Sequence, residues 1–218
     1  MINTIKYKVK FLRDFSRQRK LKRFQEKYNI WINNGAVPPI PHYGKKIILE
    51  EYVNKYKPEI FIETGTYNGH MVLSMLDKFE KVYSIELDEI LYRKAKEKFS
   101  GYKHVKILQG ESDKVLKQIL PEVQSSCLFW LDAHFSGGNT AKADIETPIM
   151  RELECIFNHP LVDNHILLID DARCFNGTND YPHITALSNY ICEKHPDWVF
   201  EVKDDVIRTF NKNQESIL

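Results

Sequence analysis

The sequence lacks the features that would place it in several special classes of protein. Its cysteines are few and far apart, and no C-x-x-C pair is present, so we expect neither a zinc site nor a redox motif. No apolar run approaches the roughly 18 residues of a membrane-spanning helix. The first 20 residues contain no apolar segment of the signal-peptide type. These absences predict a cytoplasmic protein with a core that needs no disulfide or metal staple.

A net excess of charge is also absent, because 31 Lys and Arg residues face 30 Asp and Glu residues. The charges are unevenly spread: residues 1–27 carry a net +8, so the remaining residues carry −7. Within this basic segment Ile5, Val9, Leu12 and Phe15 recur at three- and four-residue steps, which predicts a basic amphipathic helix.

We expect the apolar stripe of this helix to dock on the chain's own domain or on a second copy in a homodimer. Contact with an anionic membrane surface or with a polyanionic partner is the alternative. Nucleic acid is not an expected partner, because no recognisable nucleic-acid-binding module accompanies the basic segment.

Short apolar strands alternate with helices after residues 33–45, a proline-rich break that we expect not to be helical. Strands are predicted at 59–64, 81–87, 105–110, 127–132 and 165–171, and two β-rich runs within 198–210 predict a hairpin. Five β/α units indicate a parallel sheet with helices on both faces. The predicted fold is therefore α/β and Rossmann-like: a doubly wound, mostly parallel seven-stranded sheet with an antiparallel C-terminal hairpin.

The first concentration of polar residues lies in the segment "ETGTYNG", residues 63–69, where the first strand ends. In doubly wound sheets, ligands bind beyond the carboxyl ends of the strands. Gly65 allows a tight turn, and Gly69 can open the next helix so that a ligand approaches its N-terminus. A strand-to-helix turn uses glycine in any case, so this loop by itself is a weak signal.

Two further strand ends carry candidate ligand contacts. Glu86 could accept hydrogen bonds from ribose hydroxyls, although acids are favoured at helix N-termini without any ligand. Asp88 is the expected N-cap of the helix that follows. Glu111 or Ser112, after the third strand, could contact a purine edge, and capping of the next helix by Ser112 explains that residue equally well.

Together these elements resemble the class I S-adenosylmethionine-dependent methyltransferases over about residues 45–211. The resemblance is closest to the metal-dependent O-methyltransferases, both catechol-type enzymes and macrocin- and novobiocin-type sugar O-methyltransferases. Their first loop often reads E-x-G-x-Y-x-G, as it does here. We divide the chain into a basic helical extension with its proline-rich loop (1–44) and a methyltransferase domain (45–218). The resemblance implies that S-adenosylmethionine contacts these residues: Glu63, Gly65, Thr66, Tyr67, Gly69, Glu86, Glu111, Ser112 and Asp132.

Three carboxylates, Asp132, Asp170 and Asp171, follow the fourth and fifth strands. The resemblance implies that they hold a divalent cation, and carboxylates that converge at neighbouring strand ends repel each other unless a cation lies among them. All-oxygen ligands favour Mg²⁺, with Mn²⁺ or Ca²⁺ as alternatives. The competing interpretation is that one of the acids caps a helix or pairs with Arg173, which is itself a candidate substrate contact.

His134 lies two residues beyond Asp132, and together they form the predicted catalytic pair. The sugar-modifying relatives place their general base at the position of His134, and an imidazole pKa of about 6.5 suits proton abstraction. A purely structural His134 is the alternative. Phe135 stands where catechol-type enzymes have a lysine, which favours a sugar-like acceptor. Residues 135–144 are then expected to form a lid with a glycine hinge, and its candidate residues are Gly137, Gly138, Asn139 and Lys142.

The sequence therefore predicts an S-adenosylmethionine-dependent, divalent-metal-assisted O-methyltransferase. Its expected acceptor is a hydroxyl of a small sugar or polyol. Such a sugar would be linked to a nucleotide if the enzyme acts in the assembly of a surface glycan or a natural product. A methyltransferase of the same fold acting on a phenolic or nitrogen acceptor without a metal is the alternative. A nicotinamide-dependent oxidoreductase is disfavoured because the sequence has no G-x-G-x-x-G loop.

Overall fold

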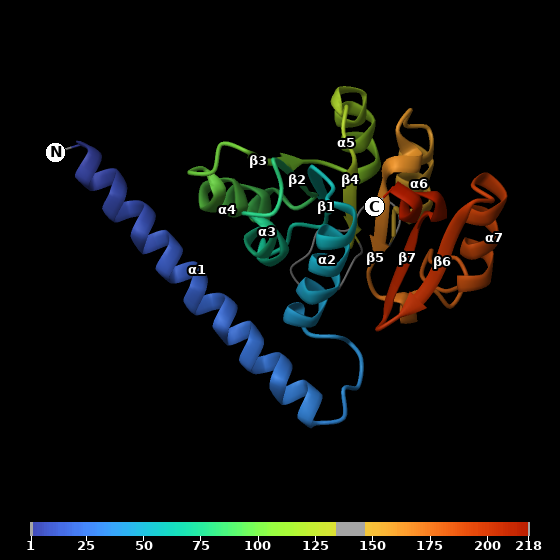
Figure 1. Ribbon diagram of the computed structural model, residues 1–218, viewed down its shortest axis with the longest axis horizontal. Helices are drawn as coiled ribbons and strands as arrows, with labels where there is room; N and C mark the ends of the chain where they lie inside the picture. The colour runs from blue at the N-terminus through green and yellow to red at the C-terminus, as the bar shows by residue number, and fades with distance from the viewer. Residues whose placement is uncertain (1, 134–146, 218) are drawn as a thin grey trace.

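A single seven-stranded sheet organises the chain in the computed structural model, which describes residues 2–133 and 147–217, with side chains from residue 14 to 214 within those ranges (Figure 1). The strand order is β3-β2-β1-β4-β5-β7-β6, with β1 to β5 parallel and β7 antiparallel to both of its neighbours. This confirms the predicted fold class. The strands are β1 (Ile60–Thr64), β2 (Lys81–Glu86), β3 (Val105–Gln109), β4 (Cys127–Leu131), β5 (Ile166–Ile169), β6 (Trp198–Lys203) and β7 (Val206–Asn211).

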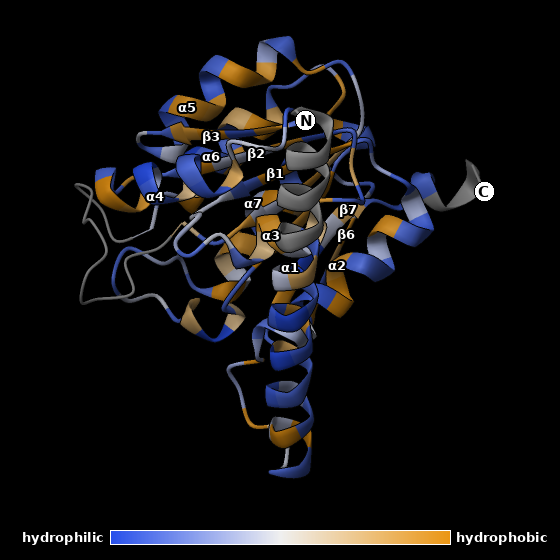
Figure 2. Cartoon of the chain, turned by 90° about the vertical axis from the view of Figure 1, so that its left-hand side faces the viewer, coloured by the Kyte–Doolittle hydropathy of each residue, from blue (hydrophilic) through white to orange (hydrophobic). Residues whose placement is uncertain are grey.

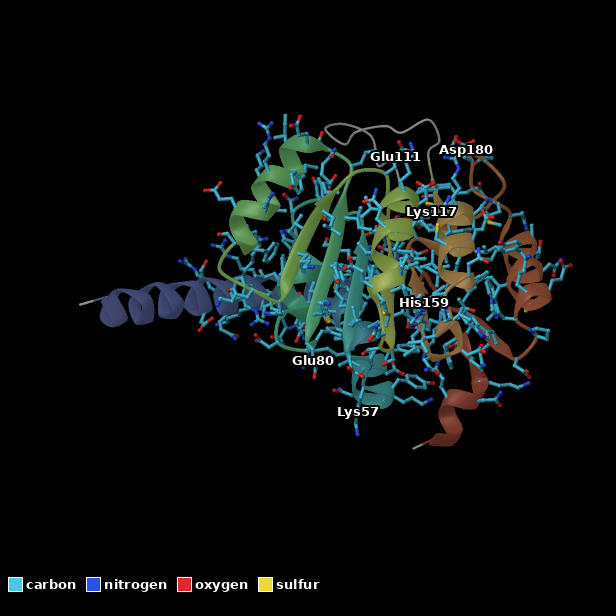
Figure 3. All side chains as sticks on the ribbon, turned by 90° about the horizontal axis from the view of Figure 1, so that it is seen from above. Lys57, Glu80, Glu111, Lys117, His159 and Asp180 are labelled. Carbon is cyan, nitrogen blue, oxygen red and sulfur yellow. The ribbon has the colours of Figure 1, made fainter. Side chains whose placement is uncertain are left out.

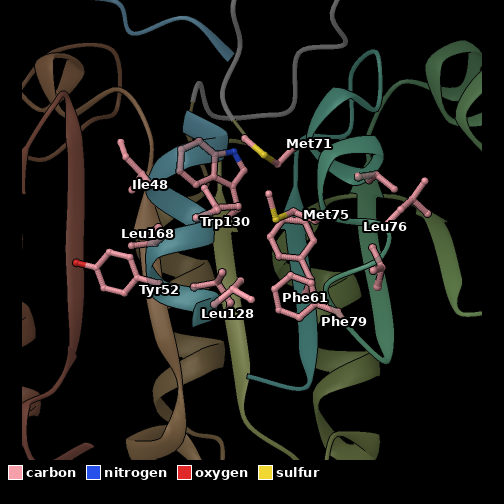
Figure 4. Close-up of a cluster of buried hydrophobic side chains, with 14 of the residues drawn as sticks. Ile48, Tyr52, Phe61, Met71, Met75, Leu76, Phe79, Leu128, Trp130 and Leu168 are labelled. Atoms are coloured by element: carbon pink, nitrogen blue, oxygen red, sulfur yellow. The ribbon is translucent and has the colours of Figure 1, made fainter. Parts of the chain in front are cut away.

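Helices cover both faces of the sheet because the central strands are apolar on both sides. In β1, for example, Phe61 packs into the cluster on one face, whereas Ile60 and Ile62 pack into the cluster on the other. Figure 4 shows part of the first cluster, in which the ring of Phe61 lies next to that of Phe79. The first face carries α2 (His42–Tyr56), α3 (His70–Met75) and α4 (Glu89–Phe99), and the second carries α5 (Ser112–Ile119), α6 (Ile149–Phe157) and α7 (Ile184–Lys194).

The helix boundaries follow local signals in most places. Asp88 caps α4 as predicted, since its Oδ1 accepts a hydrogen bond of 2.8 Å from the backbone N–H of Leu91. The predicted break over residues 33–45 is wrong at its end, because α2 begins at His42. Proline excludes helix only up to its own position, and Pro41 directly precedes the first helical residue. Residues 42–45 therefore form the first turn of α2 at the edge of the sheet.

The basic N-terminal segment forms the predicted helix, α1 (Ile2–Asn33), which projects from the body of the fold (Figures 1 and 2). It is anchored near its middle: Arg17 donates a hydrogen bond of 3.0 Å to the carbonyl of Leu73 and pairs with Asp77. Phe15 is 62% exposed, so this member of the predicted apolar stripe does not dock on the chain's own domain. Docking on a second copy stays a prediction. Among the described residues, no helix is both long enough and apolar enough to cross a membrane.

Candidate cofactor and metal site

A cavity of about 310 Å³ opens at the carboxyl ends of β1, β4 and β5. It lies where the strand order reverses between β1 and β4, the usual ligand position of doubly wound sheets. Its walls come from the loop after β1, from the residues that follow β4 and β5, and from the first turn of α2. The lining residues include Lys45, Glu63, Gly65, Thr66, Tyr67, Asp132, Asp171 and Arg173.

The loop after β1 has a fixed shape. Gly65 has a φ of +87°, and a Cβ at this position would lie 2.4 Å from the carbonyl oxygen of Asp132. Tyr67 also has a positive φ of 46°, and its backbone N–H donates a 2.6 Å hydrogen bond to Oε2 of Glu86. Only glycine can therefore occupy position 65 without moving the end of β4, and the loop joins the ends of three strands.

Glu63 is a buried carboxyl group that lines the cavity. Burial raises its pKa well above the ordinary value, and a hydrogen bond donated by Ser84 only partly opposes that shift. A cationic ligand group in the cavity would favour the ionised carboxylate. Glu63 is therefore suited to bind an ammonium group.

Glu86 holds the backbone around it. Its Oε2 accepts the hydrogen bond from Tyr67, and its Oε1 accepts a 2.9 Å hydrogen bond from the backbone N–H of Asp88. Burial raises the pKa of Glu86, and these donors act in the opposite direction. Glu86 thereby fixes the positions of the loop after β1 and the start of α4. Its predicted contact with a ribose stays a prediction.

Glu111 and Ser112 follow β3 and therefore lie at the edge of the sheet where the parallel strands end. In the view from above, Glu111 and Asp180 lie at one end of the molecule, and Glu80 lies at the opposite end (Figure 3). Glu111 precedes α5 and pairs with Lys114 at 2.5 Å. Capping by Ser112 is a wrong alternative, because Ser112 is already inside α5 and makes no capping hydrogen bond.

Glu152 of α6 is a buried acid that sequence reasoning missed. Burial raises its pKa to about 7, opposed by the hydroxyls of Ser112 and Thr64. Its Oε1 has no hydrogen-bond partner among the described residues. The sequence offers no signal for Glu152, since a glutamate within a helix is usually exposed.

The three predicted metal ligands converge. Asp132, Asp170 and Asp171 each place a carboxylate oxygen within 4.8 Å of those of the other two, an arrangement named here the acid cluster. Asp170 and Asp171 are buried. Burial raises the pKa of Asp170 the most, and the negative charge of Asp132 raises it further. The acid cluster thus attracts positive charge.

Lys45 supplies such a charge from the first turn of α2. Its ammonium pairs with Oδ2 of Asp170 and lies 3.8 Å from Oδ1 of Asp171. It also lies 5.9 Å from the ring centre of Trp130, which sits at the end of the first cluster (Figure 4). Burial alone would lower the pKa of Lys45, but the nearby carboxylates of Asp170 and Asp132 raise it, so the side chain is charged.

Arg173 makes the contact that was predicted as the competing interpretation. Its guanidinium lies 2.8 Å from Oδ1 of Asp171 and also pairs with Asp205. Asp171 therefore belongs both to the acid cluster and to the ion pair with Arg173, and metal binding by the cluster stays a prediction. Arg173 also lines the cavity, and its predicted contact with a substrate stays a prediction.

Two histidines that sequence reasoning did not single out also line the cavity. His42 lies 2.9 Å from the hydroxyl of Ser74 through its Nε2. Burial lowers the pKa of His42 to about 3 and that of His70 to about 4, with nearby positive groups acting in the same direction. Both imidazoles are therefore neutral at physiological pH. The predicted base and lid residues lie outside the described residues: His134, Gly137, Gly138, Asn139 and Lys142.

No protein-family model matches the sequence, and a comparison with curated proteins finds no match. A putative caffeoyl-CoA O-methyltransferase from Staphylococcus aureus superposes with a TM-score of 0.58 at 13% identity, covering 93% of this chain and 98% of that one. The SAH-bound methyltransferase PaMTH1 from Podospora anserina gives a TM-score of 0.56 at 18% identity, with coverages of 88% and 87%.

An O-methyltransferase from Bacillus cereus in complex with SAH gives a TM-score of 0.53 at 14% identity, covering 87% of this chain and 88% of that one. These matches span almost the whole of each chain. The protein therefore has the class I S-adenosylmethionine-dependent methyltransferase fold, as the sequence resemblance predicted.

Proposed function

We propose that this protein is an S-adenosylmethionine-dependent O-methyltransferase. The observation that carries the proposal is the junction of Glu63, Gly65 and Asp132 around a cavity at the strand-order switch. The methionine part of the cofactor has an ammonium group, which suits the buried Glu63 carboxyl. Two of the similar structures hold SAH, the product form of this cofactor.

Calorimetric titration of the full chain with S-adenosylmethionine tests the cofactor. We expect binding with one molecule per chain and no binding of NADH. Binding of NADH without binding of S-adenosylmethionine would show that the proposal is wrong.

A divalent cation at the acid cluster is the second part of the proposal. The residues present fit such an ion: the donors are three carboxylates, and the ammonium of Lys45 already occupies the place of a cation among them. Oxygen donors of this kind select a hard ion such as Mg²⁺. Asp132, Asp170 and Asp171 would hold it, and a bound ion would lower the pKa of an acceptor hydroxyl and orient it.

The chain's own residues would then complete the reaction. We assign removal of the hydroxyl proton to His134, on the strength of its position in the sequence after β4. The loop around Gly65 would hold the methyl donor beside Asp132. Turnover of His134→Ala that matches the unaltered chain at neutral pH would exclude His134 as the base.

The acceptor is proposed to be a sugar or polyol hydroxyl, which rests on His134 and on Phe135 at the position of the lysine of catechol-type enzymes. Mass spectrometry of nucleotide sugars incubated with the protein, S-adenosylmethionine and Mg²⁺ tests it. We expect the addition of one methyl group to a sugar and no methylation of catechol. Methylation of catechol alone would overturn the sugar assignment, and full turnover in excess EDTA would remove the metal from the mechanism.

A further inference from the structure

Lys45 is an unusual neighbour for a set of metal ligands. Its side chain is 17% exposed and faces Asp170, whose side chain is fully buried. A buried ammonium loses its hydration, and paired carboxylates must compensate for that loss. The space that the side chain fills therefore does not explain why residue 45 carries a positive charge.

Anchoring of α2 does not explain this charge. The helix is already fixed by apolar side chains that pack into the core on the first face, among them Ile48, Leu49 and Tyr52. An apolar residue at position 45 would not bury an ammonium, but it would leave Asp170 and Asp171 without this positive charge. Lys46, the next residue, shows the ordinary alternative, because its ammonium pairs with Glu50 on the same helix.

The hydrogen bonds of Asp170 indicate what the charge does. Oδ1 of Asp170 accepts a 2.8 Å hydrogen bond from the backbone N–H of Asp171, and Oδ2 pairs with Lys45. The backbone donor is fixed by the chain, whereas a lysine ammonium is carried on a flexible four-carbon stem. Lys45 is thus the contact of Asp170 that can be released.

We propose that Lys45 is a displaceable cation that neutralises the acid cluster when no metal is bound and competes with a metal ion for Oδ2 of Asp170. The inference rests on the metal part of the proposed function. Once released, the ammonium has room in the cavity of about 310 Å³ that Lys45 itself lines. Lys45 thereby sets the metal affinity of the site, and it is a positioning residue.

Titration with Mn²⁺ alone, followed by calorimetry, tests the competition in the full chain. Lys45→Met removes the charge and keeps most of the side-chain volume. We expect Mn²⁺ to bind this variant roughly tenfold more tightly or better, since an ammonium–carboxylate pair no longer has to be broken; tenfold corresponds to about 1.4 kcal/mol. Lys46→Met is the matched control, with an affinity equal to that of the unaltered chain.

A second neutral variant and a second measurement distinguish the loss of competition from an effect of misfolding. Lys45→Gln keeps a polar side chain and is expected to tighten Mn²⁺ binding in the same direction. Because the ammonium of Lys45 lies near Trp130, Mg²⁺ should change tryptophan fluorescence in the unaltered chain by moving that ammonium. Circular dichroism checks that each variant is folded.

The outcomes separate the inference from the function on which it rests. Equal or weaker Mn²⁺ binding by both Lys45 variants overturns the competition and leaves the metal site standing. Absence of Mn²⁺ binding in every variant overturns the metal site and the competition together. Titration with S-adenosylmethionine then still tests the methyltransferase assignment independently.

Discussion

Glu152→Gln removes a buried acid from α6 while keeping the shape of the side chain. Glu152 is 1% exposed, and burial raises its pKa to about 7 from an ordinary 4.5. Its Oε1 has no hydrogen-bond partner among the described residues that would stabilise the charge. The folded state therefore prefers the protonated acid, whereas the unfolded chain releases the proton at lower pH.

The sign of the effect follows from proton linkage. Below pH 4.5 both states are protonated, so the stabilising contribution of the protonated acid is fully present. As the pH rises to about 7, the folded state keeps a proton that the unfolded state has lost, and stability falls. The two pKa values set the total loss at about 3 kcal/mol, of which most falls between pH 5 and pH 8. Glutamine does not titrate and should not show this loss.

Urea unfolding at intervals from pH 5 to pH 8 measures the effect. We expect the free energy of unfolding of Glu152→Gln to rise relative to that of the unaltered chain by about 2 to 3 kcal/mol across this range. The exposed Glu154 lies on the same helix, and Glu154→Gln is the matched control, with no such trend expected. A stability difference for Glu152→Gln that stays constant from pH 5 to pH 8 would refute the reasoning.

Three further predictions concern single contacts. Gly65→Ala should abolish S-adenosylmethionine binding in calorimetry while circular dichroism shows a folded chain, because the new Cβ would meet the Asp132 carbonyl; unchanged affinity would contradict the rigid junction. Asp88→Ala should lower the free energy of unfolding by about 1 kcal/mol in urea titration through loss of the helix cap, and Asp88→Asn should recover most of that loss. Leu116→Ala should cost about 2 to 5 kcal/mol in the same assay because the side chain is fully buried, and a loss below 1 kcal/mol would indicate that the second cluster closes around the gap.

The fold was predictable because its signals are local and repeated. Each apolar strand is short and separated from the next by a helix, which leaves few arrangements besides a parallel sheet covered on both faces. The predicted start of α2 is too late, because proline disfavours helix only in the residues that precede it. The first turn from His42 to Lys45 shows that it acts on one side only.

The site was predictable where its residues come from strand ends. Asp132, Asp170 and Asp171 converge because neighbouring parallel strands end at the same edge of the sheet. Lys45 and Glu152 come from helices, and their directions depend on how each helix is rotated against the core. Two consecutive lysines, Lys45 and Lys46, follow the first three residues of α2, and only the packing of its apolar face selects Lys45 for the acid cluster.

The contact between Gly65 and Asp132 links the two parts of the proposed site, the loop after β1 and the acid cluster, thermodynamically. The space between the Gly65 Cα and the Asp132 carbonyl is too small for a methyl group, and the backbone N–H of Asp132 donates a 3.1 Å hydrogen bond to the carbonyl of Thr64. A ligand that shifts one strand end must therefore shift the other. Occupancy of the loop after β1 and occupancy of the acid cluster are thus expected to share a coupling free energy, which acts equally in both directions.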